Sequence, residues 1–211
     1  MLAHFRSMLT AQLAAARLYL IADARTLERV GGAAVAGGVS IVQLRERGRE
    51  LTDTTASALR ERFRDAGALF IVNDDAVLAA EIDADGVHLG QDDMAVEEAR
   101  EIVGPERLVG LSTHSAAQID AAEGVDYIGV GPVWATPTKP GYAPVGLELV
   151  RYAAERAREP FFAIGGINPA NAAEVFAAGA QRIAVVRAIG QADDPRAAAA
   201  ALLEAASPVN A

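Results

Sequence analysis

The run from residue 39 to residue 74 decides the fold, and it has three parts: VSIVQLR (39–45), TDTTASALRERFRDA (52–66) and ALFIVND (68–74). The outer two parts are dominated by Val, Ile, Leu and Phe, as expected of strands that are buried on both faces. The part between them has three Ala and three Arg among its 15 residues, and both residue types favour a helix. A buried strand, a helix and a second buried strand predict a parallel βαβ unit.

The same alternation continues along the chain in both directions. Segments with strand composition begin on average about 23 residues apart, which leaves room for one helix between neighbours. They are 18–22, 39–45, 68–73, 86–89, 107–112, 125–130, 160–164 and 182–186. The segments with helical composition between and after them include 52–66, 95–103, 146–158, 171–178 and 194–206. Glycines that we expect in left-handed C-cap conformations follow helical stretches at Gly67, Gly104, Gly124 and Gly179.

Eight strand–helix units are the number that closes a (β/α)8 barrel, or TIM barrel. We therefore predict this α/β fold over 18–206, with an extra N-terminal helix over 1–16 and a single domain over 1–211. A doubly wound open sheet is the rival, because the same alternation of strands and helices permits it.

Composition excludes several classes of protein. The 211 residues contain no Cys and carry a formal charge of −9, from 19 Lys+Arg against 28 Asp+Glu. The lack of Cys excludes a disulfide scaffold, a thiolate nucleophile and a zinc-finger-type site. The acidic balance argues against a nucleic-acid partner, and the lack of a long apolar run argues against a membrane partner. We expect a cytoplasmic protein, and self-association into a homo-oligomer is left open.

Polar residues gather where the predicted strands end, whereas the loops at the opposite ends hold mostly glycine turns. A barrel carries its catalytic residues on the loops after the strands, so this asymmetry predicts an enzyme. In chain order these positions are Gln43, Arg45, Arg47, Asn73, Asp74, Gln91, Asp92, Asp93, Ser112, Thr113, Thr136, Thr138, Lys139 and Arg187, with the glycine pair Gly165 and Gly166 at the end of the seventh strand.

Two acidic residues among them have two interpretations. Asp74 and Asp93 end neighbouring strands, so their carboxylates could meet at the mouth of the barrel and bind Mg²⁺. Each also comes just before a helical stretch, where Asp is a common N-cap. Spacing alone favours the N-cap interpretation.

The candidate cations are Arg45, Arg47 and Lys139. Arg45 and Arg47 alternate at a strand end, so they point the same way and suit a diphosphate, although the mixed charges of 45–50 could equally be a solvated surface. Lys139 lies in the long loop 132–145, which contains four prolines, and loops of that length are usually binding loops or lids.

Gly165 and Gly166 follow the seventh strand, where barrels often bind phosphate through backbone N–H groups. We expect His88, in mid-strand, to be a hydrogen-bonded interior residue and His114 to cap a helix or line the mouth, and we favour neither as a general base. In loop 132–145, Trp134 could cover a ligand or anchor the loop.

Seven short segments carry a resemblance to a known family. They are QLRER (43–47), FIVND (70–74), GVHLGQDD (86–93), GLSTH (110–114), DYIGVGP (126–132), TPTK (136–139) and AIGGI (163–167). In this order, each at or near a strand end, they resemble the thiamine-phosphate synthase family over 18–206.

The resemblance implies a barrel that joins 4-amino-2-methyl-5-hydroxymethylpyrimidine diphosphate to 4-methyl-5-(2-phosphoethyl)thiazole, releasing diphosphate and thiamine phosphate. It also implies a role for each matching residue. The pyrimidine diphosphate would be held by Gln43, Leu44, Arg45, Glu46, Arg47, Asn73, Ser112 and Lys139, with Arg45, Lys139 and Ser112 taking part in catalysis. The thiazole phosphate would be held by Thr136, Pro137, Thr138, Gly166, Val186 and Arg187, and Mg²⁺ by Asp74 and Asp93.

The chain departs from the family pattern at two of these positions. Arg47 stands where the family usually has Lys, and Arg187 stands where it commonly has Ser. We expect Arg187 to grip the thiazole phosphate with two hydrogen bonds. The alternative is that it turns outward and pairs with Asp193 or Asp194.

The chemistry implied by the resemblance needs no protein nucleophile. Loss of diphosphate leaves a pyrimidine methylene cation that the ring's amino group stabilises, so the protein has to stabilise the leaving group and exclude water. Two other functions remain open: a thiazole tautomerase-like paralogue, against which Asp74, Asp93 and Lys139 argue, and a non-catalytic barrel that binds a phosphorylated ligand.

Overall fold

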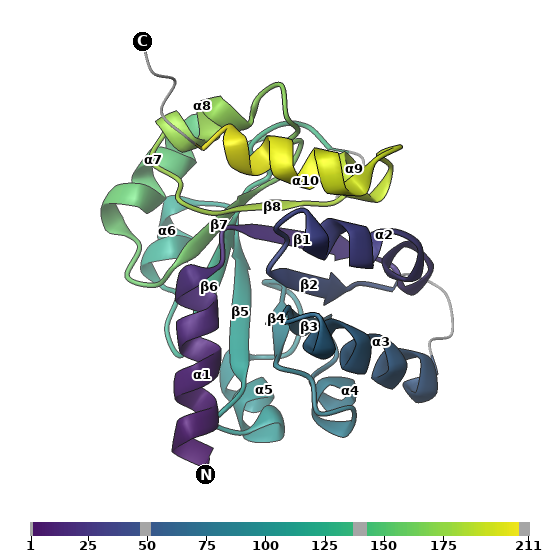
Figure 1. Cartoon of the computed structure of the whole chain (residues 1–211). Helices are drawn as coiled ribbons and strands as arrows, with labels where there is room; N and C mark the ends of the chain where they lie inside the picture. The colour runs from purple at the N-terminus through teal and green to yellow at the C-terminus, as the bar shows by residue number, and fades with distance from the viewer. Residues whose placement is uncertain (1, 47–51, 137–142, 207–211) are drawn as a thin grey trace.

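The structure is a computed structural model that describes residues 2–46, 52–136 and 143–206 (Figure 1). Within these ranges, the strands are β1 (Leu18–Ala22), β2 (Ile41–Leu44), β3 (Leu69–Asn73), β4 (Gly86–Leu89), β5 (Leu108–Thr113), β6 (Tyr127–Val130), β7 (Phe161–Ile164) and β8 (Ile183–Val185). The helices are α1 (Leu2–Ala15), α2 (Ala24–Ala36), α3 (Asp53–Asp65), α4 (Ala76–Glu81), α5 (Val96–Val103), α6 (Ala116–Asp120), α7 (Gly146–Arg156), α8 (Ala172–Ala177), α9 (Arg187–Gly190) and α10 (Pro195–Glu204).

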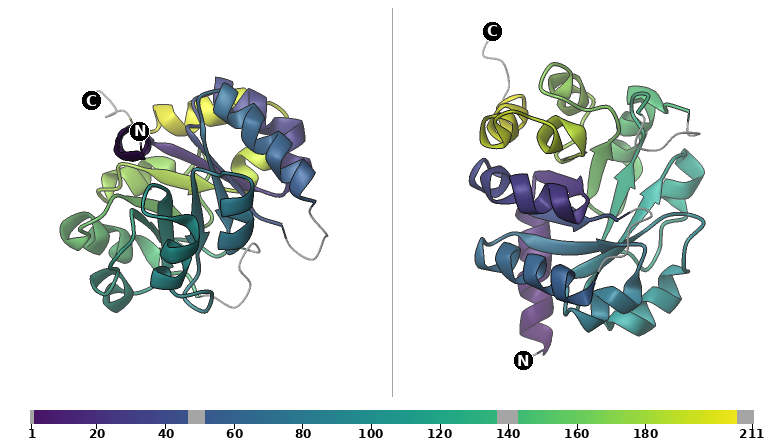
Figure 2. Two further views of the ribbon diagram at one scale, coloured as in Figure 1. Left: turned by 90° about the horizontal axis from the view of Figure 1, so that it is seen from below. Right: turned by 90° about the vertical axis from the view of Figure 1, so that its right-hand side faces the viewer.

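The eight strands form one closed parallel barrel in chain order. Each strand pairs with the next, and β1 also pairs with β8, with Leu18 opposite Ile183. The views in Figure 2 show the helices outside this ring of strands. The predicted (β/α)8 barrel is confirmed, and the open sheet is wrong because β1 and β8 leave no free edge.

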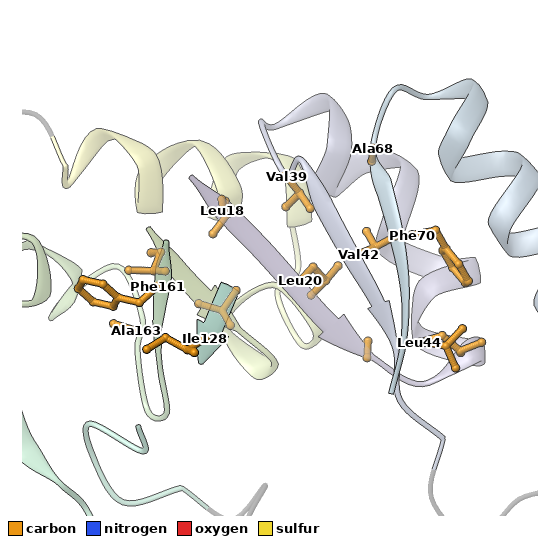
Figure 3. Packing of buried hydrophobic residues seen from close by; sticks show 14 of the residues in the cluster. Leu18, Leu20, Val39, Val42, Leu44, Ala68, Phe70, Ile128, Phe161 and Ala163 are labelled. Carbon is orange, nitrogen blue, oxygen red and sulfur yellow. The ribbon is translucent and has the colours of Figure 1, made fainter. Parts of the chain in front are cut away.

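Side chains alternate along each strand and divide the apolar interior into two clusters. Leu18 and Leu20 face the helices with Val42 of β2 in the outer cluster, seen in Figure 3. Tyr19 and Ile21 face the barrel axis in the inner cluster. This alternation follows from the period of two of a β-strand, and it decides which residues can reach the mouth.

The helices that sequence composition indicated are present, and four more occur. Of these, α2 contains Gly31 and Gly32, which lower its helix propensity, but a β-carbon at Gly31 would lie 2.3 Å from the Phe63 ring, so close packing explains the glycine. The other three, α4, α6 and α9, have only four to six residues each, too few for a clear periodic pattern. The expected C-cap at Gly124 is wrong, because α6 ends at Asp120 and its C-cap is Ala121.

Helix α1 closes the bottom of the barrel, the end at which the strands begin (Figure 1). Leu9 and Leu13 are buried in the inner cluster beside Tyr19. Arg6 donates to the carbonyl of Arg107 (2.9 Å) and forms an ion pair with Asp126, so the helix is also held by polar contacts. The interior is therefore sealed at this end and opens at the other.

Across the described ranges, no helix has both the length and the apolar character that crossing a membrane requires.

Candidate active site

A cavity of about 290 Å³ opens at the mouth, the face at which the strands end. Its lining combines apolar side chains from the inner cluster with polar residues from at least four strand ends. Eight of the site residues expected from sequence line it: Gln43, Arg45, Asn73, Ser112, Thr136, Gly166, Val186 and Arg187. The first and the last of these eight residues, Gln43 and Arg187, are 144 positions apart in the chain and share one cavity.

Two residues of the QLRER segment face away from this cavity. Leu44 is 2% exposed and belongs to the outer cluster, because it alternates with Gln43 and Arg45. The Glu46 carboxylate accepts a hydrogen bond from the backbone N–H of Ala24 (3.2 Å), at the start of α2. This bond ties the end of β2 to the β1–α2 connection.

Four of the expected site residues lie outside the described ranges. They are Arg47, Pro137, Thr138 and Lys139.

Asp74 and Asp93 are not helix N-caps. Asp75 caps α4 by accepting from the N–H of Leu78 (2.9 Å), while the N-cap of α5 is Ala95 and makes no side-chain bond. Asp74 instead has φ 64°, a left-handed conformation that is uncommon for a residue other than glycine. The N-cap interpretation is wrong because the residue after Asp74 does the capping.

The two carboxyl groups meet at the mouth. Burial and a hydrogen bond to Asp93 raise the pKa of Asp74 from 3.8 to about 6, although the charge of Arg45 acts in the opposite direction. Asp93 also accepts from the N–H of Gly90 (2.7 Å), which fixes its position. A neighbouring carboxyl group disfavours the charged form of Asp74, and a bound cation would relieve that repulsion.

This donor set fits a hard divalent cation. Mg²⁺ is usually held by one or two carboxylates together with water and substrate phosphate oxygens. Among the described residues, no group of three or more His, Asp or Glu side chains has the geometry of a metal site. Asp74 and Asp93 would therefore be the ligands from the described protein, and the other ligands would come from water and substrate.

Hydrogen-bonded side chains cross the floor of the cavity. Gln43 Nε2 donates to Tyr19 Oη (2.7 Å), which lies 3.1 Å from Tyr127 Oη. Tyr127 Oη is 3.2 Å from His88 Nδ1, and His88 Nε2 is 3.0 Å from Ser112 Oγ. His88 is thus a hydrogen-bonded interior histidine, as expected. The two tyrosines were not expected, although inward-facing alternate positions on 18–22 and 125–130 could have indicated them.

The loop after β7 brings backbone groups to the rim of the cavity. Gly165 and Gly166 have φ values of 102° and 71°, which glycine adopts without strain. A β-carbon on Gly166 would lie 2.8 Å from the β-carbon of Trp134, and the backbone N–H of Trp134 donates to the carbonyl of Gly165 (3.0 Å). Trp134 therefore anchors its loop to the β7 end.

Arg187 begins α9 rather than ending β8, and it is exposed at the rim of the cavity. In the part of the chain that the structure describes, Arg187 forms no ion pair. Asp194 caps α10 by accepting from the N–H of Ala197 (2.9 Å). Arg187 thus lines the cavity and forms an ion pair with neither Asp193 nor Asp194 in the described ranges, and its role at the thiazole phosphate stays a prediction.

His114 also lines the cavity, in line with one of its two expected roles. Its ring Nδ1 is hydrogen-bonded to the carbonyl of Gly131, and its backbone N–H donates to the side chain of Gln118 (2.7 Å). A carbonyl oxygen only accepts, so Nδ1 carries the proton. His114 thereby links the ends of β5 and β6.

Comparison with known proteins gives matches over most of the chain. A family model described as "Thiamine monophosphate synthase" matches residues 18–189. The thiamine-phosphate synthase of Saccharopolyspora erythraea is 52% identical over 208 residues, covering 91% of this chain and 93% of that protein; the one of Arthrobacter sp. strain FB24 is 49% identical over 222 residues, covering 90% and 94%. The solved structure of thiamine phosphate pyrophosphorylase from Pyrococcus furiosus is 37% identical, with a TM-score of 0.81, covering 92% of this chain and 97% of that one.

Proposed function

Because this chain belongs to the thiamine monophosphate synthase family, we propose that its mouth cavity joins a pyrimidine diphosphate to a thiazole phosphate. The protein is an enzyme, a transferase of thiamine biosynthesis built on a (β/α)8 barrel. One observation carries the proposal: eight expected binding residues line a single cavity, with a carboxylate pair at the same face.

The two substrates occupy different parts of the cavity in this proposal. The pyrimidine diphosphate is held by Gln43, Arg45, Asn73 and Ser112, together with Arg47 and Lys139 from outside the described ranges. The thiazole phosphate is held by Thr136, Gly166, Val186 and Arg187, together with Pro137 and Thr138. Leu44 and Glu46 contribute indirectly in this proposal. Their side chains hold β2 in position, and β2 carries Gln43 and leads into Arg45.

The reaction is a substitution at the methylene carbon of the pyrimidine. The C–O bond to the diphosphate breaks and both electrons leave with the diphosphate. The thiazole nitrogen then gives its lone pair to the methylene carbon, forming the new C–N bond. Arg45 stabilises the negative charge that grows on the leaving group, and the apolar walls formed by Ile21, Phe162 and Ile164 keep water from the cation.

Asp74 and Asp93 are proposed to hold Mg²⁺. When bound, this cation would stabilise the negative charge of the diphosphate leaving group. Because burial and Asp93 raise the pKa of Asp74, a proton on Asp74 would compete with the cation at low pH. The proposal also includes a cytoplasmic location and a single domain over 1–211.

An incubation with both substrates tests the function. The purified protein, 4-amino-2-methyl-5-hydroxymethylpyrimidine diphosphate, 4-methyl-5-(2-phosphoethyl)thiazole and Mg²⁺ should yield thiamine phosphate and diphosphate in equal amounts. Reactions lacking one substrate, or containing excess chelator, are the controls and should yield neither product at a comparable rate.

The same assay separates the rival functions. Isomerisation of a thiazole precursor without diphosphate release would indicate a tautomerase-like paralogue. Saturable binding of either phosphorylated ligand without any turnover would indicate a non-catalytic barrel. Either result contradicts the synthase proposal.

A further inference from the structure

Five polar side chains form one hydrogen-bonded row across the floor of the cavity: Gln43, Tyr19, Tyr127, His88 and Ser112. All five are at most 9% exposed. The roles assigned so far cover the two ends of the row, Gln43 and Ser112. They do not explain the three residues between them, Tyr19, Tyr127 and His88.

Each hydrogen bond in the row has its donor on the Gln43 side and its acceptor on the Ser112 side. The amide nitrogen of Gln43 can only donate, so Tyr19 Oη accepts from it. Among the described residues, Tyr19 has one other hydrogen-bonding partner, Tyr127 Oη, which must therefore receive the Tyr19 proton. A buried hydroxyl without an acceptor is unfavourable, so the opposite orientation is disfavoured.

The same donor-to-acceptor order determines which ring nitrogen of His88 carries the proton. Tyr127 Oη accepts from Tyr19 and its own proton is left for His88 Nδ1, 3.2 Å away. Burial raises the pKa of both tyrosines well above their ordinary value, so each keeps its single proton at any working pH. With Nδ1 accepting, neutral His88 carries its proton on Nε2 and donates it to Ser112 Oγ (3.0 Å).

The backbone leaves space for this arrangement. A β-carbon on Gly110 would lie 2.2 Å from the Tyr127 ring and 2.6 Å from His88 Nδ1, so a larger residue would occupy the place where these two side chains meet. The His88 and Tyr127 rings stack, with centroids 5.5 Å apart and planes 29° apart. The contact between Tyr127 and His88 is therefore closely packed as well as hydrogen-bonded.

We propose that Gln43, Tyr19 and Tyr127 are positioning residues that fix His88 in its Nε2–H tautomer, so that Ser112 presents its hydroxyl as a donor to the pyrimidine diphosphate. The inference rests on the proposed function for the identity of the ligand. The direction of the row does not depend on it. Ser112 Oγ accepts from His88, which leaves the serine proton for an acceptor other than His88.

The first test is spectroscopic and needs no substrate. In protein labelled with ¹⁵N at histidine, the His88 ring should show a protonated Nε2 and an unprotonated Nδ1 at neutral pH. Tyr127→Phe removes only the hydroxyl, and the His88 signals should then move toward a mixture of both tautomers. A protonated Nδ1 in the wild-type protein would overturn the proposal.

The second test asks whether Tyr127 acts through Ser112. Tyr127→Phe should lower kcat/KM for the pyrimidine diphosphate by about tenfold, the equivalent of one hydrogen bond to a charged group, and leave the KM for the thiazole phosphate unchanged. In a Ser112→Ala background the same substitution should have almost no further effect. Full additivity of the two substitutions would show a merely structural role and would overturn the proposal.

Two more variants complete the design. Tyr19→Phe alters the row one residue further from His88, and it serves in both tests if Tyr127→Phe does not fold. Tyr152→Phe is the matched control, because its hydroxyl donates to Asp120 (2.6 Å) outside the cavity, and its kinetics should equal those of the wild type. Failure of wild-type turnover would contradict the synthase function, whereas the tautomer would still decide the direction of the row.

Discussion

At the bottom of the barrel the carboxylate of Asp126 is surrounded by donors, whereas at the mouth the carboxyl of Asp74 faces a second carboxyl. Asp126 is bound by Arg6, by Arg100 (2.8 Å) and by the backbone N–H of Val109 (2.8 Å). Its side chain is 11% exposed. Asp74 has a left-handed backbone and a neighbour of the same charge.

The difference separates stability from function within one fold. Opposite charges and complete hydrogen bonding at the bottom stabilise the folded chain. Like charges and an uncommon backbone conformation at the mouth lower its stability, and such features persist where a ligand uses them. Substitutions at the two ends should therefore change different measurements.

The largest effect is expected at the mouth. Asp93→Asn removes one of the two proposed Mg²⁺ ligands, and it should lower kcat/KM by about a hundredfold or more. The melting temperature should not fall, because the substitution also removes a repulsive charge next to Asp74. Steady-state kinetics and thermal unfolding of the same preparation measure both.

Asp120→Asn provides the control, since Asp120 is an exposed residue at the end of α6, outside the cavity. Its kinetics should match those of the wild type. Undiminished turnover of Asp93→Asn in buffer treated with chelator would contradict the proposal that Asp74 and Asp93 bind Mg²⁺.

The reverse pattern is expected at the bottom. Asp126→Ala leaves Arg6 and Arg100 without their shared carboxylate, and we expect it to lower the free energy of unfolding by about 2 kcal/mol, because both arginines are partly exposed. Urea unfolding measures this loss. The kcat of the folded fraction should stay unchanged, and a fall in kcat without a loss of stability would contradict the division between the two ends.

Arg187 tests whether the rim of the mouth binds phosphate. Arg187→Ala should raise the KM for the thiazole phosphate by about tenfold, since it removes a charge-assisted contact, while the KM for the pyrimidine diphosphate hardly moves. Equal weakening of both substrates, or of neither, would exclude this role.

The smallest effect concerns pH. The pKa of Asp74 is raised to about 6, so a proton competes with the cation below that pH. Mg²⁺ should therefore bind about tenfold more weakly at pH 5 than at pH 7.5. Without a cation, the stability of the folded chain should change with pH in the opposite direction to Mg²⁺ binding. The raised pKa of Asp74 means that the folded chain holds this proton more tightly than the unfolded chain, so the carboxyl stabilises the folded state at low pH. This contribution is lost as the pH rises through 6. Calorimetric titration of Mg²⁺ at several pH values would show the shift, and a flat profile would contradict it.

The sequence predicted most of what depends on periodicity. Strand–helix alternation together with the count of eight units predicted the barrel, and residues at strand ends, such as Gln43 and Ser112, do line the cavity. Assigning the whole segment QLRER (43–47) to one ligand was less accurate, because Leu44 and Glu46 alternate with Gln43 and Arg45 along the strand and face away from the cavity. Period two along 39–45 already separates these side chains into two sets.

Other features depend on contacts that no local pattern contains. Two aspartates in succession after β3 do not indicate which one caps the helix; in the structure Asp75 does so, and Asp74 takes a left-handed conformation. Tyr19 and Tyr127 are 108 residues apart, and their contact requires the barrel to be closed.

Helix α1 has a consequence for how the two substrates meet. Because Leu9 and Leu13 fill the barrel below Tyr19, traffic through the described part of the barrel must use the mouth in both directions. A ligand on the floor beside Gln43 would then have to arrive before one at the rim beside Arg187, and the joined product would have to leave past the same rim. Under the proposed function, a barrel closed at one end in this way would make the order of substrate binding depend on depth in the cavity.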